Sequence, residues 1–299
     1  GWTTEKYQGR VNTIASALGK VEPAPDIIIF QEVESLGILE AIASSLSGDT
    51  WSHFAGNPGA ALGLGIISRY PLLESKIHSI TTNGQTAPRP VLETRVQAGE
   101  GKLVIFACHW KSKIGSDEVT ENVRRASARV ILRRIRELQK ESPELGVIIA
   151  GDLNENYDEF FRQGSAAISA LLPDDPYCAQ LTGAGTDAEC QKDFIVISRN
   201  SPPEAVHFSK ECIVLFSPWM RDIEDGSYYY KHEWETIDHF LISGQFFTNS
   251  GWDYEKAAVA NYPPFSGTDG MPIPYNMRTG AGLSDHLPLT LTLKLKGAE

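Results

Sequence analysis

Residues 146–154 of the chain read GVIIAGDLN, an apolar run that ends in a glycine, an aspartate and, two residues later, an asparagine. A short, continuous apolar run bounded by turn residues is typical of a strand that is buried on both faces. The same arrangement occurs at residues 26–32 (DIIIFQE) and 103–109 (LVIFACH). Because each run leads directly into polar residues, we expect these polar side chains to converge at one edge of a sheet.

Stretches with helical periodicity alternate with these strands. We expect amphipathic helices over residues 3–18, 36–46 and 119–139, and further strands over 62–68, 91–96, 194–198, 236–243 and 289–295. Two stretches, about 200–235 and 251–283, show no clear periodicity and are rich in proline, glycine and aromatic residues, which is typical of long functional loops. Because no linker or repeat divides the chain, residues 1–299 predict a single α/β domain with strands inside and helices outside.

The composition narrows the functional classes. The chain has 299 residues, with 27 Lys and Arg against 38 Asp and Glu, and its formal net charge is −11. This balance argues against a protein that holds nucleic acid by bulk positive charge, but not against an enzyme that cuts nucleic acid and releases it. No uninterrupted apolar run approaches the roughly 20 residues that a membrane-spanning helix needs, so no transmembrane segment is expected.

The four cysteines are too few for a disulfide scaffold, and they form no C-x-x-C motif. They are Cys108, Cys178, Cys190 and Cys212. Cys178 and Cys190 fall in one expected loop and could pair in an exported protein, whereas free thiols are the simpler interpretation.

Carboxylates, amides and imidazoles gather at the ends of the expected strands. In chain order they are Gln31, Glu32, His109, Asp152, Asn154, Asp238, Asp285 and His286. Oxygen donors without cysteine suit a hard cation, and histidines supply proton transfer near neutral pH. These groups together predict metal-assisted hydrolysis of a phosphoester. Each signal alone is weak, because Glu32 could be a solvated acid, His109 a structural histidine, and Asp152 and Asn154 turn residues.

The ordered set Gln-Glu, His, Gly-Asp-x-Asn, Asp-His and Ser-Asp-His resembles the endonuclease/exonuclease/phosphatase superfamily over residues 26–295, as does GIISRYP at residues 65–71. This superfamily includes pancreatic-type deoxyribonuclease, abasic-site endonucleases, sphingomyelinases and inositol polyphosphate 5-phosphatases. Segments at residues 109–113, 226–228 and 282–288 look like a bacterial branch of predicted nucleases. The resemblance implies an α/β fold of the deoxyribonuclease type, a four-layer sandwich of two mixed β-sheets flanked by helices.

The resemblance also implies a role for each polar residue of the site. His109 would contact the scissile phosphate and stabilise its developing charge. Asp152 and Asn154 would position the nucleophile or the phosphate. His286 would transfer protons, and Asp238 would accept a hydrogen bond from it and so fix its tautomer.

A divalent cation is part of the same resemblance. Glu32 would be the main metal ligand, with Gln31 supporting it and Asp285 close to the metal. The expected ion is Mg²⁺ or Mn²⁺, and Ca²⁺ remains an alternative.

One feature departs from the family pattern. Family members begin with a strand that ends in an asparagine of the site, ahead of the Gln-Glu strand. Here only the helix over residues 3–18 precedes residue 26, and Asn12 lies inside that helix. We therefore expect a domain that lacks its first strand in this chain, with the strand upstream in a longer protein or with a site that works without that amide.

Positive charge and aromatic rings bear on the substrate. Lys111 and Arg124 would place positive charge near His109 and bind the substrate phosphate. The arginines from Arg129 to Arg136 are expected to form a solvated outer face of their helix.

Aromatic residues of the late loops could stack on bases or sugars, or could pack the loops down. They are Trp219, Tyr228, Tyr229, Tyr230, Trp234, Tyr262, Phe265 and Tyr275.

The sequence thus predicts a Mg²⁺- or Mn²⁺-dependent phosphoric ester hydrolase, first of all a nuclease-like phosphodiesterase. The alternatives are a phosphatase or phosphodiesterase of a small molecule or lipid head group, and an inactive binding module on the same fold. The expected partner is a phosphoester substrate, either nucleic acid or a small molecule, and we expect a monomer without a stable protein partner. A start at Gly1 fits a removed signal peptide or a trimmed chain, and a secreted or periplasmic location is favoured over a cytoplasmic one.

Overall fold

An eight-stranded mixed sheet lies at the centre of the computed structural model, which describes residues 2–46, 51, 53–56, 63–99, 101–164, 168–183, 191–249 and 251–295. Its strand order is β10-β11-β12-β15-β9-β8-β7-β4. The strands are β4 (Leu72–His78), β7 (Val91–Ala98), β8 (Gly101–His109), β9 (Gly146–Asp152), β10 (Leu171–Pro173), β11 (Ile195–Ser198), β12 (Val214–Phe216) and β15 (Asp238–Ile242).

A second layer of strands packs against one face of this sheet. It consists of the antiparallel sheet β1-β3-β2 and the antiparallel pair β16–β17. Apolar side chains of β1, β3, β16 and β17 share one core cluster with the central sheet. The strands of this layer are β1 (Ile27–Gln31), β2 (His53–Gly56), β3 (Leu64–Ser68), β16 (Trp252–Val259) and β17 (Leu289–Leu295).

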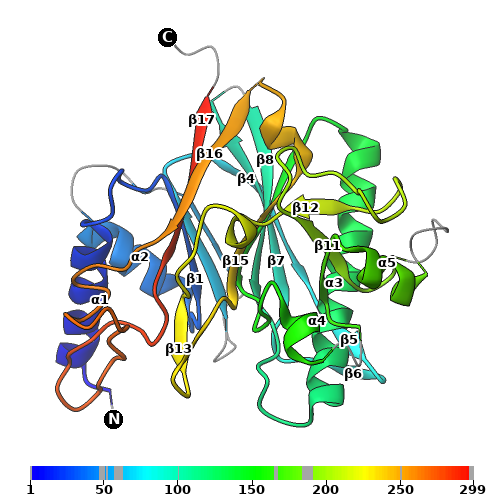
Figure 1. Ribbon diagram of the computed structural model, residues 1–299. Helices are drawn as coiled ribbons and strands as arrows, with labels where there is room; N and C mark the ends of the chain where they lie inside the picture. The colour runs from blue at the N-terminus through cyan, green and yellow to red at the C-terminus, as the bar shows by residue number, and fades with distance from the viewer. Residues whose placement is uncertain are drawn as a thin grey trace.

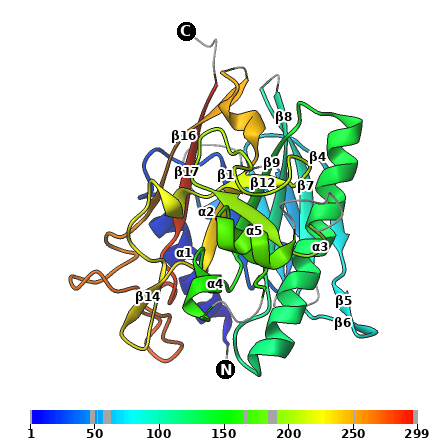
Figure 2. The same cartoon turned by 45° about the vertical axis from the view of Figure 1, so that its right-hand side comes forward.

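Helices cover both outer sides of the two strand layers. Helices α1 (Thr4–Leu18) and α2 (Leu36–Ser45) pack on the outer face of β1 and β3, while α3 (Asp117–Glu141) packs on the far face of the central sheet. Figures 1 and 2 show this arrangement from two directions, with α1 and α2 on one side of the molecule and α3 on the other. Four layers result, as the resemblance implies. Helices α4 (Glu159–Arg162) and α5 (Pro176–Thr182) pack near β10 and β11.

Shorter elements complete the described part of the chain. They are the strand pair β5 (Thr81–Thr82) and β6 (Gln85–Thr86), the hairpin β13 (Tyr228–Tyr230) and β14 (Glu233–Glu235), and the 3₁₀ turns η1 (Pro218–Met220) and η2 (Gly244–Phe247).

The apolar runs are continuous because both faces of the central sheet are covered. In β8, the side chains of Val104, Phe106 and Cys108 pack toward α3, and those between them pack toward the second strand layer. Successive side chains of a strand point to opposite faces. By the same alternation, His109 at the end of β8 faces the second strand layer. The alternation of side chains along each strand therefore decides which polar side chains point into the space between the two strand layers.

Most expected elements are confirmed, and the strand at residues 289–295 has the expected bounds. One expectation was wrong, because residues 252–259 of the supposed loop form β16. Residues 72–78, for which no strand was predicted, form the edge strand β4. Strand β4 was not predicted because its sequence shows no apolar pattern. Among the described strands it pairs only with β7, and it is largely exposed.

The arginine-rich face of α3 is only partly solvated, and the expectation was wrong for Arg134. Its Nε and Nη2 atoms donate hydrogen bonds to the two carboxylate oxygens of Glu93, at 2.7 and 3.0 Å. Glu93 lies on β7 and is 1% exposed, and Nε2 of His78 lies 2.7 Å from its Oε2 atom. A carboxylate beneath a helix requires such a partner, since an unpaired buried charge is strongly destabilising.

This buried pair predicts sensitivity to acid. Burial alone would raise the pKa of Glu93, but its hydrogen bonds to His78 and Arg134 lower it from 4.5 to about 2. Because the folded pKa lies below the unfolded one, the stabilisation is complete above about pH 4.5 and is lost as the pH falls toward 2. Glu93→Gln should lower the free energy of unfolding at pH 7 by about 3 kcal/mol and flatten its pH dependence below pH 4.5, measured by urea denaturation.

Glu137→Gln is the matched control, because Glu137 also accepts a hydrogen bond from Arg134 but its side chain is 51% exposed. It should change stability by less than about 1 kcal/mol. A Glu93→Gln variant with an unchanged acid response would contradict this account.

Strands β1 and β17 are edges of the second strand layer. In the described ranges, β1 pairs only with β3, and β17 pairs only with β16. The expectation that this chain lacks the first strand of the family fold stays a prediction.

Cys108 and Cys178 are buried free thiols, whereas the suggested partner Cys190 lies outside the described residues. Among the described helices, none combines the length and apolarity needed to cross a membrane.

Candidate active site

Three of the expected site residues lie level with one another on neighbouring strands. His109 at the end of β8 is in register with Asp152 of β9, and Asp152 is in register with Asp238 of β15. All three side chains point toward the second strand layer. Ala107, Ala150 and Phe240 lie two residues away on the same strands, so they share those faces, and they belong to the core cluster between the layers. The three polar side chains therefore meet at one end of the space between the two layers.

Asp152 is fixed by the turn that follows it. Both of its carboxylate oxygens accept hydrogen bonds from Asn154, one from the backbone N–H and one from Nδ2, each at 2.8 Å. Asn154 adopts a left-handed φ of 52° and also donates from Nδ2 to the carbonyl of Trp110. Asp152 and Asn154 are therefore turn residues, and the same turn orients the Asp152 carboxylate in the candidate site. Gly151 is required here, since a Cβ would lie 2.2 Å from the carbonyl oxygen of Cys108.

Asp238 and His286 form a hydrogen-bonded pair. Nδ1 of His286 lies 2.8 Å from Oδ2 of Asp238, and the hydroxyl of Ser227 donates to the same oxygen at 2.7 Å. Nε1 of Trp219 donates to the backbone carbonyl of Asp238. The expected contact between Asp238 and His286 is present, and it leaves Nε2 of the imidazole for a reacting group. His239, the next residue on the strand, points to the opposite face and bonds the carbonyl of Glu155.

His109 is buried beside Asp152 and is incompletely satisfied. Its Nε2 lies 3.4 Å from Oδ2 of Asp152, and within the described chain its Nδ1 is buried without a hydrogen-bond partner. A buried polar atom without a partner is uncommon, and a ligand or a water molecule can satisfy it. This geometry agrees with a histidine that contacts substrate.

The site shifts the pKa values of its ionisable groups in opposite directions. Burial, followed by repulsion from Arg89, lowers the pKa of His109 to about 3. Burial, followed by repulsion from Asp238, raises the pKa of Asp152 to about 7. Burial alone would lower the pKa of His286, but attraction and a hydrogen bond from Asp238 raise it to about 10. Such divergent shifts are typical of functional sites.

Arg89 belongs to this site, and sequence reasoning missed it. Its Nη1 atom donates a hydrogen bond to the carbonyl of Trp110, and both Asp152 and Glu32 attract its half-buried guanidinium. Arg89 thus lies where Glu32 of the second strand layer approaches Asp152 of the central sheet. The only sequence signal was an arginine between two prolines at residues 88–90.

Gln31 and Glu32 reach the same place from β1. The amide nitrogen of Gln31 lies 2.7 Å from the position that a Cβ on Gly151 would occupy, so the amide packs against the end of β9. Glu32 is exposed, and its backbone has a left-handed φ of 60°. A non-glycine residue in this conformation is uncommon and is often found at functional sites.

The oxygen donors fit a loosely held divalent cation better than a preformed cage. Glu32 and Asp285 are both exposed, and Asp285 acts electrostatically on His286. Within the ranges that the structure describes, no group of three or more His, Cys, Asp or Glu residues is close enough to hold a metal by itself. Mg²⁺ is usually held by one or two carboxylates together with water and substrate phosphate, so this donor set suits that manner of binding.

Arg124 does not reach the site surface, and its expected role as a substrate-binding residue is corrected. It is 1% exposed, and its guanidinium bonds the carboxylates of Glu121 and Glu155 and the carbonyl of Lys111. The ammonium of Lys111 bonds the carbonyls of Ser112 and Ile114. Arg124 is buried because two acids from separate segments surround it, so it shapes the Lys111 loop from inside.

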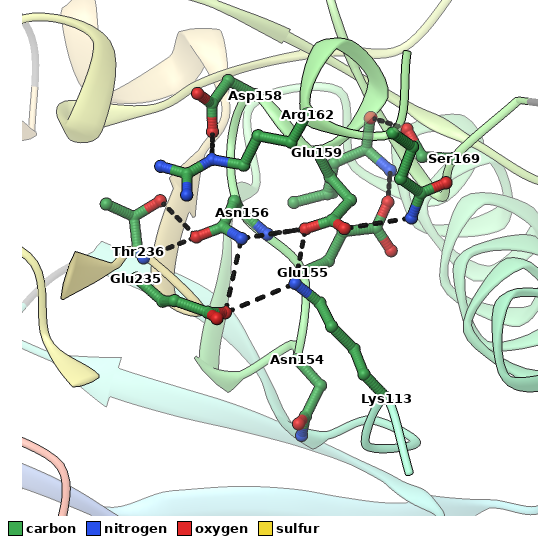
Figure 3. A network of polar contacts seen from close by, with 12 residues as sticks. Lys113, Asn154, Glu155, Asn156, Asp158, Glu159, Arg162, Ser169, Glu235 and Thr236 are labelled. Carbon is green, nitrogen blue, oxygen red and sulfur yellow. Dashed lines mark hydrogen bonds and ion pairs between the residues drawn. The ribbon is translucent and has the colours of Figure 1, made fainter. Parts of the chain in front are cut away.

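A second polar network anchors the loops around Asn154 (Figure 3). Nζ of Lys113 donates to Glu159 at 2.7 Å and to Glu235 at 3.3 Å. Asn156 donates to Glu159 and accepts a hydrogen bond from the backbone of Thr236. This network joins the loop after β8, the turn after β9 and the β13–β14 hairpin, which are far apart in the sequence.

A sequence model described as the Endonuclease/Exonuclease/phosphatase family matches residues 5–286. The chain belongs to this family. Membership supports a role as a phosphoester hydrolase or nuclease-like enzyme, in a family whose members generally use divalent metals. No curated protein sequence matches the chain significantly.

Solved structures of the family share the fold at low sequence identity. D. rerio TDP2 in complex with a single-strand DNA product is 18% identical, with a TM-score of 0.58 over 97% of this chain and 94% of that one. Truncated Caenorhabditis elegans TDP2 is 13% identical, with a TM-score of 0.57 over 98% and 92%. A family protein from Bacteroides thetaiotaomicron is 15% identical, with a TM-score of 0.55 over 98% and 88%.

Proposed function

We propose that this chain is a Mg²⁺- or Mn²⁺-dependent phosphodiesterase with nuclease-like chemistry. The observation that carries the proposal is the level arrangement of His109, Asp152 and Asp238 on three adjacent strands, with His286 bonded to Asp238. Structural similarity to D. rerio TDP2, which was solved with a single-strand DNA product, agrees with a nucleic-acid substrate.

Glu32 and Asp285, with Gln31 next to Glu32 at the end of β1, would hold the divalent cation. A bound cation would neutralise phosphate oxygens and assist formation of the nucleophile. Both carboxylates are exposed, so substrate oxygens and water can complete the coordination.

Arg89 and His109 would bind the scissile phosphate from the central sheet. The guanidinium of Arg89 supplies positive charge and donors that match phosphate oxygens. His109 has a buried nitrogen that lacks a partner in the described chain, and a phosphate oxygen would satisfy it. Asn154 holds both oxygens of Asp152 in place, so the carboxylate keeps one orientation while substrate enters.

Asp152 and His286 would move the protons of hydrolysis. A water molecule attacks phosphorus, and the bond from phosphorus to the leaving oxygen breaks. Asp152 accepts the proton of the water, and Nε2 of His286 gives a proton to the leaving oxygen. Asp238 holds Nδ1 of His286, so it fixes the ring and stabilises the imidazolium form.

The test is a panel of substrates assayed with and without metal. It comprises single-stranded and plasmid DNA, RNA, bis-p-nitrophenyl phosphate, inositol phosphates and sphingomyelin, each with EDTA and after addition of Mg²⁺ or Mn²⁺. We expect cleavage of nucleic acid that EDTA stops and either metal restores. Activity that survives exhaustive chelation would contradict the metal dependence, and release from one small substrate alone would identify a phosphatase instead.

Arg89 gives a first prediction about phosphate binding. Arg89→Met should lower kcat/KM for single-stranded DNA by about 10- to 100-fold, because a charged hydrogen bond of this kind contributes about 1.5–3 kcal/mol. Steady-state kinetics measures the loss, and thermal denaturation checks that the bond to the Trp110 carbonyl is not essential for folding. Arg133→Met, on the exposed side of α3, is the control and should retain wild-type kcat/KM. Equal activity of the two variants would remove Arg89 from the site.

A further inference from the structure

The β13–β14 hairpin carries aromatic rings on both faces, and the two faces differ. Tyr229 and Trp234 are cross-strand partners, and their rings meet edge to face at 5.3 Å. Tyr228 and Tyr230 lie on the other face, with nearly parallel rings whose centroids are 6.0 Å apart and whose planes differ by 15°. One face of the hairpin therefore packs inward, and the other presents stacked rings.

The presented face starts at the candidate active site. The ring of Tyr228 stacks on His286, with centroids 4.5 Å apart and an angle of 26° between the planes. The next ring along is Tyr230, which is 48% exposed and has the ammonium of Lys231 at 5.1 Å from its centroid. His286, Tyr228 and Tyr230 thus form a row of stacked rings that runs outward from the proton-transfer group.

The other late aromatics are used for packing. Trp219 is buried, Tyr262 and Phe265 contact each other edge to face, and Tyr275 stacks on Trp2 of the helix α1 region. Packing, one of the two interpretations left open by the sequence, therefore describes these residues. Among the residues that the structure describes, only the row on β13 joins an exposed ring to the site.

The row is held in place relative to the site. The backbone of Ser227, just before Tyr228, accepts a hydrogen bond from Leu287 N–H, and its hydroxyl bonds Asp238. A β-bridge joins Tyr228 to His286, and Glu235 at the base of the hairpin pairs with Lys113. Because these bonds come from both sides, the stacked rings are oriented before substrate arrives.

We propose that Tyr230, supported by Tyr228, stacks with a nucleobase next to the scissile phosphate, so that the substrate is a single-stranded polynucleotide. This inference rests on the function proposed above and specifies its substrate class. A flat, exposed ring suits the π-face of any base, and bases of a duplex are already stacked and unavailable. Lys231 at the outer end of the row adds a positive charge that would attract the phosphates of the polynucleotide, although the net charge of the whole chain is negative.

The test compares two oligonucleotides that differ only in one base. The first is a short 5′-fluorescein oligothymidylate with a single cleavable phosphodiester, and the second carries an abasic residue beside that bond. Binding is measured by fluorescence anisotropy in EDTA, and cleavage is measured with Mg²⁺. The proteins are wild type, Tyr230→Leu, Tyr230→Phe as the conservative variant, and Tyr177→Leu, a control whose ring is 50% exposed on helix α5 and lies outside the row of stacked rings.

We expect Tyr230→Leu to raise the Kd and KM for the thymidylate about tenfold, which is the size of one base–aromatic stack. It should leave the abasic oligonucleotide unaffected, and Tyr230→Phe should behave as wild type. Equal losses on both oligonucleotides, or no loss on either, would overturn the stacking proposal while cleavage by the wild type upholds the proposed function. Base-dependent binding without cleavage would uphold the stack and reject the phosphodiesterase.

Discussion

His286→Ala is expected to lower kcat for phosphodiester cleavage by about 10³-fold, near the middle of the range for a general acid or base. The imidazole is the only group bonded to Asp238 that also leaves a nitrogen free toward the site, among the contacts of the described residues. Its removal takes away the proposed proton donor to the leaving oxygen. The binding of single-stranded DNA should change far less, because in the proposed mechanism Arg89 and His109 hold the phosphate. Single-turnover kinetics separates these two effects.

Removing His286 also leaves Asp238 with Ser227 as its remaining side-chain partner, so folding needs an independent check. His286→Gln retains an N–H that can bond Asp238, and it should be as inactive as the alanine variant with a melting temperature closer to wild type. His207→Ala, which changes an exposed histidine, serves as the control. Turnover near the wild-type rate in both His286 variants would disprove its role in proton transfer.

The sequence predicted which residues face the site because alternation is local. Once residues 103–107 and 147–150 are identified as strands buried on both faces, the side to which His109 and Asp152 point follows from the pleat alone. The register was not predictable in this way. A slip of one residue reverses every side chain, and only the folded sheets show that His109, Asp152 and Asp238 lie at one level.

The residues that sequence reasoning missed depend on partners distant in the chain. Arg124 was predicted to bind the substrate phosphate and Arg134 to lie on a solvated helix face. Each is buried instead, because acids from other segments, Glu155 and Glu93, lie beneath the helix. Arg89 follows no motif, and its position appears only when its loop is placed above Trp110. Local patterns give no information about such pairs, since the compensating charge belongs to another element.

Glu32→Gln is expected to lower kcat by about 10³-fold at a fixed, moderate Mg²⁺ concentration, since a bound cation contributes several kcal/mol to transition-state stabilisation. The exchange preserves the size of the side chain and removes only its charge. Both residues have a Cβ, so the left-handed backbone at this position is equally strained before and after the change. The loss should be partly recovered at high Mg²⁺, because weaker binding of the ion is the cause.

Metal binding itself separates a ligand from a residue that merely lies near the substrate. Mn²⁺ titration followed by electron paramagnetic resonance should show a weaker site in Glu32→Gln and an unchanged one in Glu34→Gln, which alters an exposed acid two residues away. If both variants bind Mn²⁺ and turn over DNA like the wild type, Glu32 is not a ligand.

If Mn²⁺ binding is intact but kcat still falls, the charge of Glu32 acts on Arg89 instead, whose guanidinium it attracts. Arg89→Met would then cancel most of the effect of Glu32→Gln in the double variant, whereas two independent roles would give additive losses.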